Sequence, residues 1–470
     1  MSGYYVHRTP RRERRQQFAL AVAVFVGLLV LVRAVTDPGP NGLPATFGVI
    51  EATLGVVVAI VSFSAARFDR VDQPTDDDVR AASVFYRGGI DVTDQPWFFD
   101  RGRRYRETLQ QVDTRIAVSG IRGKSTTVRR LHDVFHERGY DTFAKITGDQ
   151  PVTLHNGEER PIERRGAQTT LYENRYLITR AVERLESADP AETNVAVFEN
   201  HAITEYTMRV FNETFFRPDV VVVPNVRTDH TETLGRTRQD ITRSFARSIP
   251  REAHVVSGER NDAVHEYLAK ELRARGVAVS RVDVPPEYRD LPGAESVFCV
   301  DHVLELLDEP PLPEDRVERA LRALRPSWRR LADGSRVFNA AKVNEIESTE
   351  LFRRLLAGTG DDAELVCPLV FFRGDRRGRT ASFATYLDDL YDRGYADRAH
   401  LAGANARAVA DRVDVPVTVH DADRESPADV LDAALAEGQP VMTMANTVHP
   451  FMRSLVAEIS ERTVETVAPA

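Results

Sequence analysis

The stretch Gly120-Ile121-Arg122-Gly123-Lys124-Ser125-Thr126 joins a predicted buried strand at residues 115–119 to a predicted helix at residues 126–138. A glycine-rich turn in this position directs backbone N–H groups and the positive end of the helix dipole towards an anion. Lys124 can reach the terminal phosphates of a nucleotide, and the hydroxyl of Ser125 or Thr126 can bind Mg²⁺. The predicted ATP-binding residues of this loop are Gly120, Arg122, Gly123, Lys124, Ser125 and Thr126.

This loop is shorter than the pattern Gly-x-x-x-x-Gly-Lys-Ser/Thr, so the alternative interpretation is a tight turn that carries a solvated lysine. Lysine occurs in the chain only at positions 124, 145, 270 and 342, whereas arginine is abundant. A lysine in the loop therefore favours phosphate binding over surface decoration.

The chain has 470 residues, enough for two or three domains, and a formal net charge of −9. Residues 1–66 carry more arginines than carboxylates, so the remainder is more acidic than the total suggests. An acidic, lysine-poor surface argues against a nucleic-acid partner. The two cysteines, Cys299 and Cys367, occur in apolar runs that resemble strands, which predicts buried free thiols.

Two apolar stretches, residues 18–32 and 43–66, predict an N-terminal transmembrane helical hairpin over residues 1–66. Arginines precede the first stretch and follow the second, so both chain ends are expected in the cytoplasm. The protein is then a multi-pass protein of the cell membrane whose catalytic domains are cytoplasmic. The alternative for the first stretch is a signal peptide. Residues 67–112 are predicted to be a cytoplasmic connector.

Strands and helices alternate from residue 113 onwards, which predicts an α/β fold with a doubly wound, mostly parallel sheet. Glu199 follows a strand at 195–198, and the segment from Asn225 to His230 follows a strand at 219–223. We expect these residues and the loop to lie together at the carboxyl edge of the sheet, where such folds bind ligands. His132 and His136, on the helix after the loop, are predicted to be ordinary surface residues.

The central domain is predicted to span residues 113–330, and a smaller C-terminal α/β domain residues 331–470. Strands are expected in the C-terminal domain at 336–340, 365–372 and 440–444. Helices are expected to start at Ser348, Ser382 and Pro450.

With these motifs in place, the chain resembles the ATP-dependent Mur-type ligases. In that family a short Gly-x-x-Gly-Lys-Ser/Thr loop, a glutamate after a strand and an Asn-x-x-x-Asp-His segment build one ATP–Mg²⁺ site. The segments at 143–148, 225–235, 245–250, 344–349 and 373–379 resemble those of the poly-γ-glutamate synthase ligase subunits. The resemblance covers residues 113–460 and implies a P-loop Mur-ligase central domain.

The resemblance also implies roles for individual residues. The implied catalytic residues are Lys124, Glu199 and His230, and the implied metal ligands are Ser125, Glu199 and His230. Beyond the loop, the implied ATP-binding residues are Asn225, Arg373, Asp375 and Arg376. Lys145 and Thr147 are implied to contact the substrate carboxylate.

Two features depart from the family pattern. Many Mur-type ligases hold a second Mg²⁺ with a carbamylated lysine, and this chain has no lysine between 145 and 270. Glu345 and Ile346 replace the usual Asp-Pro pair in the C-terminal domain.

A ligase of this type activates a carboxylate as an acyl phosphate by taking the γ-phosphoryl group of ATP, and an amine then displaces phosphate. The sequence thus predicts an ADP-forming acid–amino-acid ligase that elongates poly-γ-glutamate at the cytoplasmic face of the membrane. Its expected cofactors are ATP and Mg²⁺, and its expected partners are glutamate, the growing chain and a small multi-span membrane subunit. The alternatives are a Mur-like or folyl-polyglutamate-like ligase with another acceptor, and a membrane-tethered P-loop NTPase that drives assembly or export.

Overall fold

The structure of the chain is a computed structural model. The described residues are 105–147, 151–162, 171–185, 194–201, 204–341, 343, 345–374, 377–445 and 449–468. The predicted membrane hairpin at 1–66, most of the predicted connector, and the site candidates Asp375 and Arg376 lie outside these residues. None of the helices within the described ranges combines the length and the apolar character that a membrane span requires.

The chain forms two compact units. The larger unit, residues 111–162 and 183–470, contains both sheets and all the predicted site residues that the structure describes. The described part of the smaller unit is residues 105–110 and 171–182, in which Arg175 lies over the ring of Tyr105.

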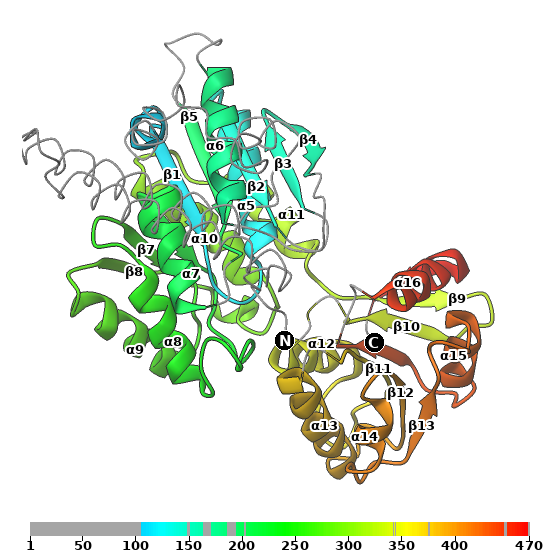
Figure 1. The fold of residues 1–470 in the computed structure, drawn as a ribbon. Coiled ribbons are helices and arrows are strands. Elements are labelled where there is room, and N and C mark those ends of the chain that lie inside the picture. Colours follow the sequence, from blue (N-terminus) through cyan, green and yellow to red (C-terminus); the bar gives the residue numbers. More distant parts are fainter. Residues whose placement is uncertain are drawn as a thin grey trace, which may run out of the picture. The chain divides into compact units, whose positions relative to one another are not determined.

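The first sheet has the strand order β4-β3-β2-β5-β1-β6-β7-β8 (Figure 1). Its strands are β1 (Thr114–Val118), β2 (Asp141–Ile146), β3 (Val152–His155), β4 (Glu158–Pro161), β5 (Asn194–Glu199), β6 (Val220–Val223), β7 (His254–Ser257) and β8 (Ala278–Arg281). Six neighbouring strands run parallel, in the order β2, β5, β1, β6, β7 and β8. Beyond β2, the strands β3 and β4 extend the sheet with antiparallel pairing. The predicted α/β fold with a mostly parallel sheet is therefore confirmed.

Helices cover both faces of the first sheet. The helical elements of this part are α5 (Lys124–Glu137), α7 (Glu205–Val210), the π-helical η2 (Phe211–Phe216), α8 (Arg238–Ser248), α9 (Asp262–Arg273), the 3₁₀ turn η3 (Pro286–Tyr288), α10 (Ala294–Leu306) and α11 (Glu314–Arg322). Helix α6 (Tyr172–Leu185) belongs mostly to the smaller unit. On one face, apolar side chains of α5 and α10 pack against Ile116 and Val118 of β1. On the opposite face, Phe198 of β5 stacks on Phe216 of η2.

The second sheet has the strand order β13-β12-β11-β14-β10-β9-β15. Its strands are β9 (Trp328–Leu331), β10 (Arg336–Asn339), β11 (Cys367–Phe372), β12 (Ala399–Gly403), β13 (Val417–His420), β14 (Val441–Met444) and β15 (Thr463–Val467). β9 pairs antiparallel with both β10 and β15, whereas the other strand pairs of this sheet are parallel. The domain boundaries drawn from the sequence remain a prediction, although the second sheet begins with β9.

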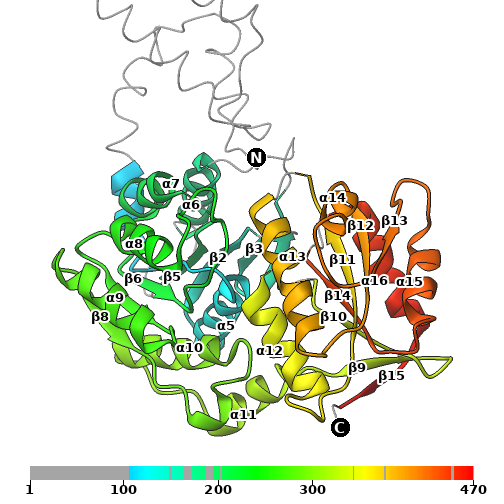
Figure 2. The ribbon, with the colours of Figure 1, turned by 90° about the horizontal axis from the view of Figure 1, so that it is seen from below.

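Alternating residues of β11 divide the core of the second sheet into two layers. Its helices are α12 (Ile346–Ala357), α13 (Arg377–Asp392), α14 (Ala406–Ala410), α15 (Pro427–Leu435) and α16 (Pro450–Arg462). Val370 and Phe372 pack against α13 and α14, whereas Leu369 and Phe371 pack against α15 and α16. Figure 2 shows α13 and α16 on opposite sides of these strands.

Several local expectations are wrong. Cys299 lies in helix α10 and not in a strand, although its thiol is buried as expected. His132 is fully buried rather than on the surface, because α5 packs this side of the helix against the rest of the domain. Helix α12 is capped by the side chain of Glu345 and not by Ser348, and α13 begins at Arg377, ahead of Ser382.

Candidate functional site

The strand order places the predicted loop at the point where the chain direction across the sheet reverses. β1 lies between β5 and β6. The strands beyond β5 extend the first sheet towards one edge, and those beyond β6 extend it towards the other. Val118 at the end of β1 pairs with Glu199 at the end of β5 and with Val222 of β6. The loop, Glu199 and the segment after β6 therefore share the carboxyl edge of the sheet, where α/β proteins bind ligands.

The glycines of the loop permit a close turn. Gly120 has φ +94° and Gly123 has φ +80°, in the left-handed region. A β-carbon at Gly120 would lie 2.8 Å from the backbone oxygen of Asn225. A side chain at this position would thus push the loop away from the end of β6.

Asn225 fixes the first half of the loop through three hydrogen bonds. Its backbone oxygen accepts from the N–H of Ile121 at 3.2 Å, and its Oδ1 accepts from the N–H of Arg122 at 3.0 Å. Its Nδ2 donates to the carbonyl of Arg122 at 3.2 Å. The side chain of Asn225, predicted to bind ATP, is therefore engaged in holding the loop.

The second half of the loop offers free donors in the geometry of an anion site. The first bond of α5 is from the N–H of Thr127 to the carbonyl of Gly123 at 2.9 Å. The preceding N–H groups, at the amino end of a 14-residue helix, have no partner within that helix. These N–H groups lie at the positive end of the helix dipole, so together they form a site that can bind a phosphate group.

Lys124 folds back over this loop. Its Nζ donates to the carbonyls of Gly120 and Ile121, at 3.1 and 3.2 Å. Burial lowers the pKa of Lys124, and the negative charge of Glu199 opposes that shift. The ammonium group is thus held beside the helix end and can exchange carbonyl contacts for phosphate oxygens.

Glu199 connects the loop to the strand beside it. Its Oε2 accepts from the hydroxyl of Ser125 at 2.9 Å and from the N–H of Thr147 at 3.0 Å. The side chain is only 4% exposed. A hydroxyl and a carboxylate in contact fit two oxygen ligands of Mg²⁺, which takes few protein ligands and keeps water or phosphate at the other positions. Lys145, in β2, is fully buried and pairs in register with Phe198.

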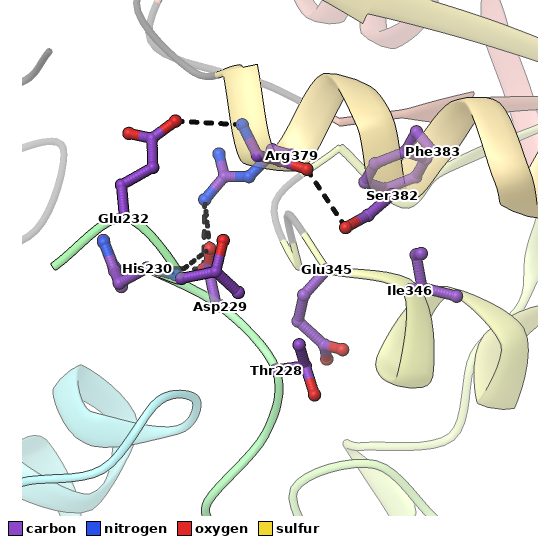
Figure 3. Close-up of a pocket in the computed structure, with 11 residues that line it drawn as sticks. Thr228, Asp229, His230, Glu232, Glu345, Ile346, Arg379, Ser382 and Phe383 are labelled. Carbon is purple, nitrogen blue, oxygen red and sulfur yellow. Dashed lines mark hydrogen bonds and ion pairs between the residues drawn. The ribbon is translucent and has the colours of Figure 1, made fainter. Parts of the chain in front are cut away.

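Asp229 lies between two guanidinium groups. Its carboxylate accepts from Arg122 at 2.9 Å. It also accepts from Arg379 of α13 at 3.0 Å (Figure 3). Burial alone would raise the pKa of Asp229, but His230, Arg122 and Arg379 hold it far below its ordinary value. His230 has φ +53°, rare for a residue with a side chain, and its N–H donates to Oδ1 of Asp229 at 2.8 Å.

A pocket opens beside this carboxylate. It is lined by Thr228, Asp229, His230, Thr231, Glu232, Glu345, Ile346, Gly378, Arg379, Ser382 and Phe383. Glu232 accepts from the backbone N–H of Gly378 at 2.9 Å, in the first turn of α13. The segment after β6 and the start of α13 therefore line one pocket.

A second ion pair, between Arg227 and Glu345, is buried next to the pocket, which Glu345 helps to line. Arg227, 2% exposed, donates to Oε1 of Glu345 at 3.1 Å and to the hydroxyl of Ser348. The same Oε1 of Glu345 accepts from the N–H of Ser348 at 2.8 Å. Glu345, whose type departs from the family pattern, thus caps α12 and neutralises Arg227.

The structure brings most of the predicted residues together. Ser125, Glu199 and Thr147 form one hydrogen-bonded group next to Lys124, and Arg122 links the loop to Asp229 and its neighbour His230. Arg373 lies after β11, where its carbonyl accepts from Asn405 at 3.1 Å. Within the described ranges, no three histidine, cysteine, aspartate or glutamate side chains gather as a metal cluster.

Arg379 and Arg227 were not predicted as site residues. The segment 373–379 resembles a family motif, but nothing in its sequence indicates which arginine reaches Asp229. Arg227 lies inside the Asn225–His230 segment, and only a buried partner distant in the chain reveals its role.

We predict that Asp229→Asn lowers the free energy of unfolding by roughly 3 kcal/mol at pH 7, because it leaves two partly buried arginines facing a neutral group. The pKa of Asp229 is depressed in the folded state, so its contribution is complete above the ordinary aspartate pKa of about 4 and is lost as the pH falls below it. Urea titrations from pH 7 to pH 3 should therefore show the difference between the two proteins shrinking.

The matched control for this prediction is Asp219→Asn. Asp219 pairs with Arg115 at 2.8 Å but is 44% exposed, so its loss should cost about 1 kcal/mol or less. A difference for Asp229→Asn that stays constant down to pH 3 would contradict the depressed pKa.

Comparisons with known proteins agree with this geometry. Residues 329–462 match the family described as the poly-gamma-glutamate synthase CapB C-terminal domain. PGA synthase CapB of Bacillus subtilis (strain 168) is 27% identical over 189 residues, 40% of this chain and 46% of that protein. The capsule biosynthesis protein CapB of Bacillus anthracis is 30% identical over 168 residues, 35% of this chain and 34% of that protein. The matches thus span less than half the length of these curated relatives.

A solved structure shares the fold over most of both chains. The bifunctional folylpolyglutamate synthase/dihydrofolate synthase of Yersinia pestis, complexed with AMPPNP and Mn ion, has a TM-score of 0.53 and 17% identity. The similarity covers 80% of this chain and 97% of that one. Residues 329–462 thus match the CapB C-terminal domain family, and the chain shares the fold of this folylpolyglutamate synthase.

Proposed function

We propose that this protein is an ATP-dependent carboxylate–amine ligase that elongates poly-γ-glutamate. The observation that carries the proposal is the joint placement of a phosphate-type loop, its lysine and a hydroxyl–carboxylate pair at the switch point of a parallel sheet. The curated relatives are named for poly-γ-glutamate and capsule synthesis, which supports the choice of polymer.

The proposed reaction has two steps. The terminal carboxylate of the acceptor attacks the γ-phosphorus of ATP, which breaks the bond to ADP and gives an acyl phosphate. The amine of the next glutamate then attacks the acyl carbon, forms the amide and releases phosphate and a proton. Since both steps move charge on phosphate oxygens, the protein acts mainly by positioning and by charge neutralisation.

The described residues fit these tasks. The N–H groups at the start of α5 and the ammonium of Lys124 would hold the β- and γ-phosphates. Lys145 and Thr147, on and just after β2, would meet the acceptor carboxylate. His230, beside Asp229, would steady the acyl phosphate or a metal. Asn225, Arg373, Asp375 and Arg376 were predicted to contact the nucleotide, and we retain the last three in that role.

The oxygen ligands present also fit a divalent cation. Ser125 and Glu199 would bind Mg²⁺, with His230 as the candidate for a further ligand. The cation would neutralise phosphate charge as phosphoryl transfer proceeds. The Yersinia pestis neighbour is described with AMPPNP and an Mn ion, which supports nucleotide and metal use by this fold.

We also propose the membrane location and a membrane partner. Residues 1–66 would form a hairpin with both ends in the cytoplasm, as their apolar stretches and flanking arginines indicate. A small multi-span subunit of a synthase complex would then contact this hairpin.

The function is tested by replacing the amine with hydroxylamine in a reaction with ATP, Mg²⁺ and a glutamate-polymer acceptor. An acyl phosphate intermediate predicts hydroxamate together with ADP, whereas adenylation would yield AMP. Lys124→Ala should reduce both products by at least about a hundredfold, because the lysine supplies charge to the phosphates. ATP hydrolysis by the wild type that needs no carboxylate acceptor and gives no hydroxamate would instead indicate a transport-type NTPase.

The metal role of Glu199 has its own test. Glu199→Gln keeps the shape of the side chain but removes an anionic ligand, so half-maximal activity should require about tenfold more Mg²⁺. The affinity for ATP should change less. Glu213→Gln, an exposed glutamate on η2, is the control and should leave the titration unchanged. An unaltered Mg²⁺ titration for Glu199→Gln would remove this residue from the metal site.

The membrane proposal predicts a labelling pattern. A cysteine placed at Asn41, in the turn between the apolar stretches, should react with an impermeant thiol reagent added outside the cell. A cysteine placed at Ser2 should react only after the membrane is opened. The reverse pattern would invert the topology, and removal of the N-terminus during export would favour a signal peptide.

A further inference from the structure

A buried carboxylate lies behind the phosphate-binding loop. Glu295, in the first turn of α10, is 1% exposed and is not among the predicted site residues. Its Oε1 accepts a hydrogen bond from Nδ2 of Asn225 at 2.8 Å. Glu295 is therefore linked to the loop through Asn225.

The chemistry of this contact fixes which way the amide of Asn225 faces. An ionised carboxylate only accepts hydrogen bonds, so Glu295 requires the NH₂ group of Asn225 on its side. That orientation leaves Oδ1 towards the N–H of Arg122 and Nδ2 towards its carbonyl. A reversed amide would place donor against donor at Arg122 and acceptor against acceptor at Glu295, which is costly for buried groups.

Two arginines lie close to the carboxylate of Glu295. Nη2 of Arg227 lies 3.6 Å from Oε1, and Nη2 of Arg260 lies 3.6 Å from Oε2. Both distances exceed that of a good hydrogen bond, so these groups supply charge rather than direct contacts. Oε2 itself has no hydrogen-bond partner among the described residues. Oε1 of Glu295 is thus the oxygen that orients Asn225, through the hydrogen bond that it accepts from Nδ2.

We propose that Glu295 is a positioning residue for nucleotide binding. By orienting Asn225, it holds the peptide groups on both sides of Arg122, and thereby presents the N–H groups at the start of α5 in a fixed arrangement. The inference rests on the proposed nucleotide-dependent function, because it assigns a task within that site. It adds a residue of α10, distant in the sequence, to the determinants of phosphate affinity.

The test measures the binding of ADP with Mg²⁺ to the full-length chain, so it needs no turnover. Glu295→Met keeps a similar volume but has no strong acceptor, so the affinity should fall by about tenfold or more. Glu295→Gln retains an acceptor oxygen, so its affinity should stay within about threefold of the wild type. Equal effects of the two variants, or no effect of Glu295→Met, would overturn the proposal.

A double-variant cycle separates positioning from general destabilisation. If Glu295 acts through Asn225, then Asn225→Ala combined with Glu295→Met should bind ADP no more weakly than Asn225→Ala alone. Additive losses would show that Glu295 acts by another route and would overturn the proposal.

A second pair of variants covers the case in which Glu295→Met does not fold. Asn225→Asp places a carboxylate oxygen against Oε1 of Glu295 and should weaken binding by about tenfold or more. Glu295→Gln added to it supplies an N–H donor and should recover part of the loss. No recovery would overturn the proposal.

Two controls complete the design. Glu309→Gln removes a partly buried carboxylate that accepts from Arg138 at 2.8 Å in the same domain, away from the loop, and should leave ADP affinity unchanged. Lys124→Ala should abolish binding if the loop is the nucleotide site. A wild type that binds no nucleotide would overturn the proposed function and this inference together. A wild type that binds ADP while every Glu295 variant binds equally well would overturn this inference alone.

Discussion

The candidate site depends on the parallel pairing of β1 with β5 on one side and β6 on the other. The N–H of Ser119 donates to Val222 at 2.8 Å and that of Asn200 donates to Val118 at 2.9 Å, so the three strand ends are joined directly. Parallel strands that run in the same direction end at the same edge of a sheet, where the chain continues from each strand into a loop. Residues more than a hundred positions apart in the chain meet at this edge because the strands that precede them are neighbours.

Charge balance is the second constraint on the site. Two buried carboxylates, Asp229 and Glu345, neutralise the guanidinium groups of Arg122, Arg379 and Arg227. A buried pair gains little net energy over apolar side chains, but the loss of one partner is costly. These pairs therefore fix where the segment after β6 and the helices α12 and α13 can make contact.

Much of this arrangement could be predicted from the sequence because it rests on local signals. Apolar runs marked β1, β5 and β6, and the loop sequence indicated both the turn and the helix that follows. Cys299 was misplaced because a short apolar run cannot by itself distinguish a buried strand from a buried helix. Arg379 and Glu295 could not be found, because their roles arise from contacts with residues 150 and 70 positions away.

The contrast between lysine and arginine in this chain has a structural reason at the loop. Arginine forms the ion pairs, where its planar fork can engage a carboxylate with two N–H groups, as Arg115 does with Asp219. Lys124 instead folds back within one turn so that its Nζ reaches carbonyls three and four residues earlier. A guanidinium group is wider and its donors are fixed in a plane, whereas an ammonium group is compact and can redirect its three protons from carbonyl to phosphate oxygens without moving the loop. The position at the helix end therefore favours lysine even in a protein that uses arginine almost everywhere else.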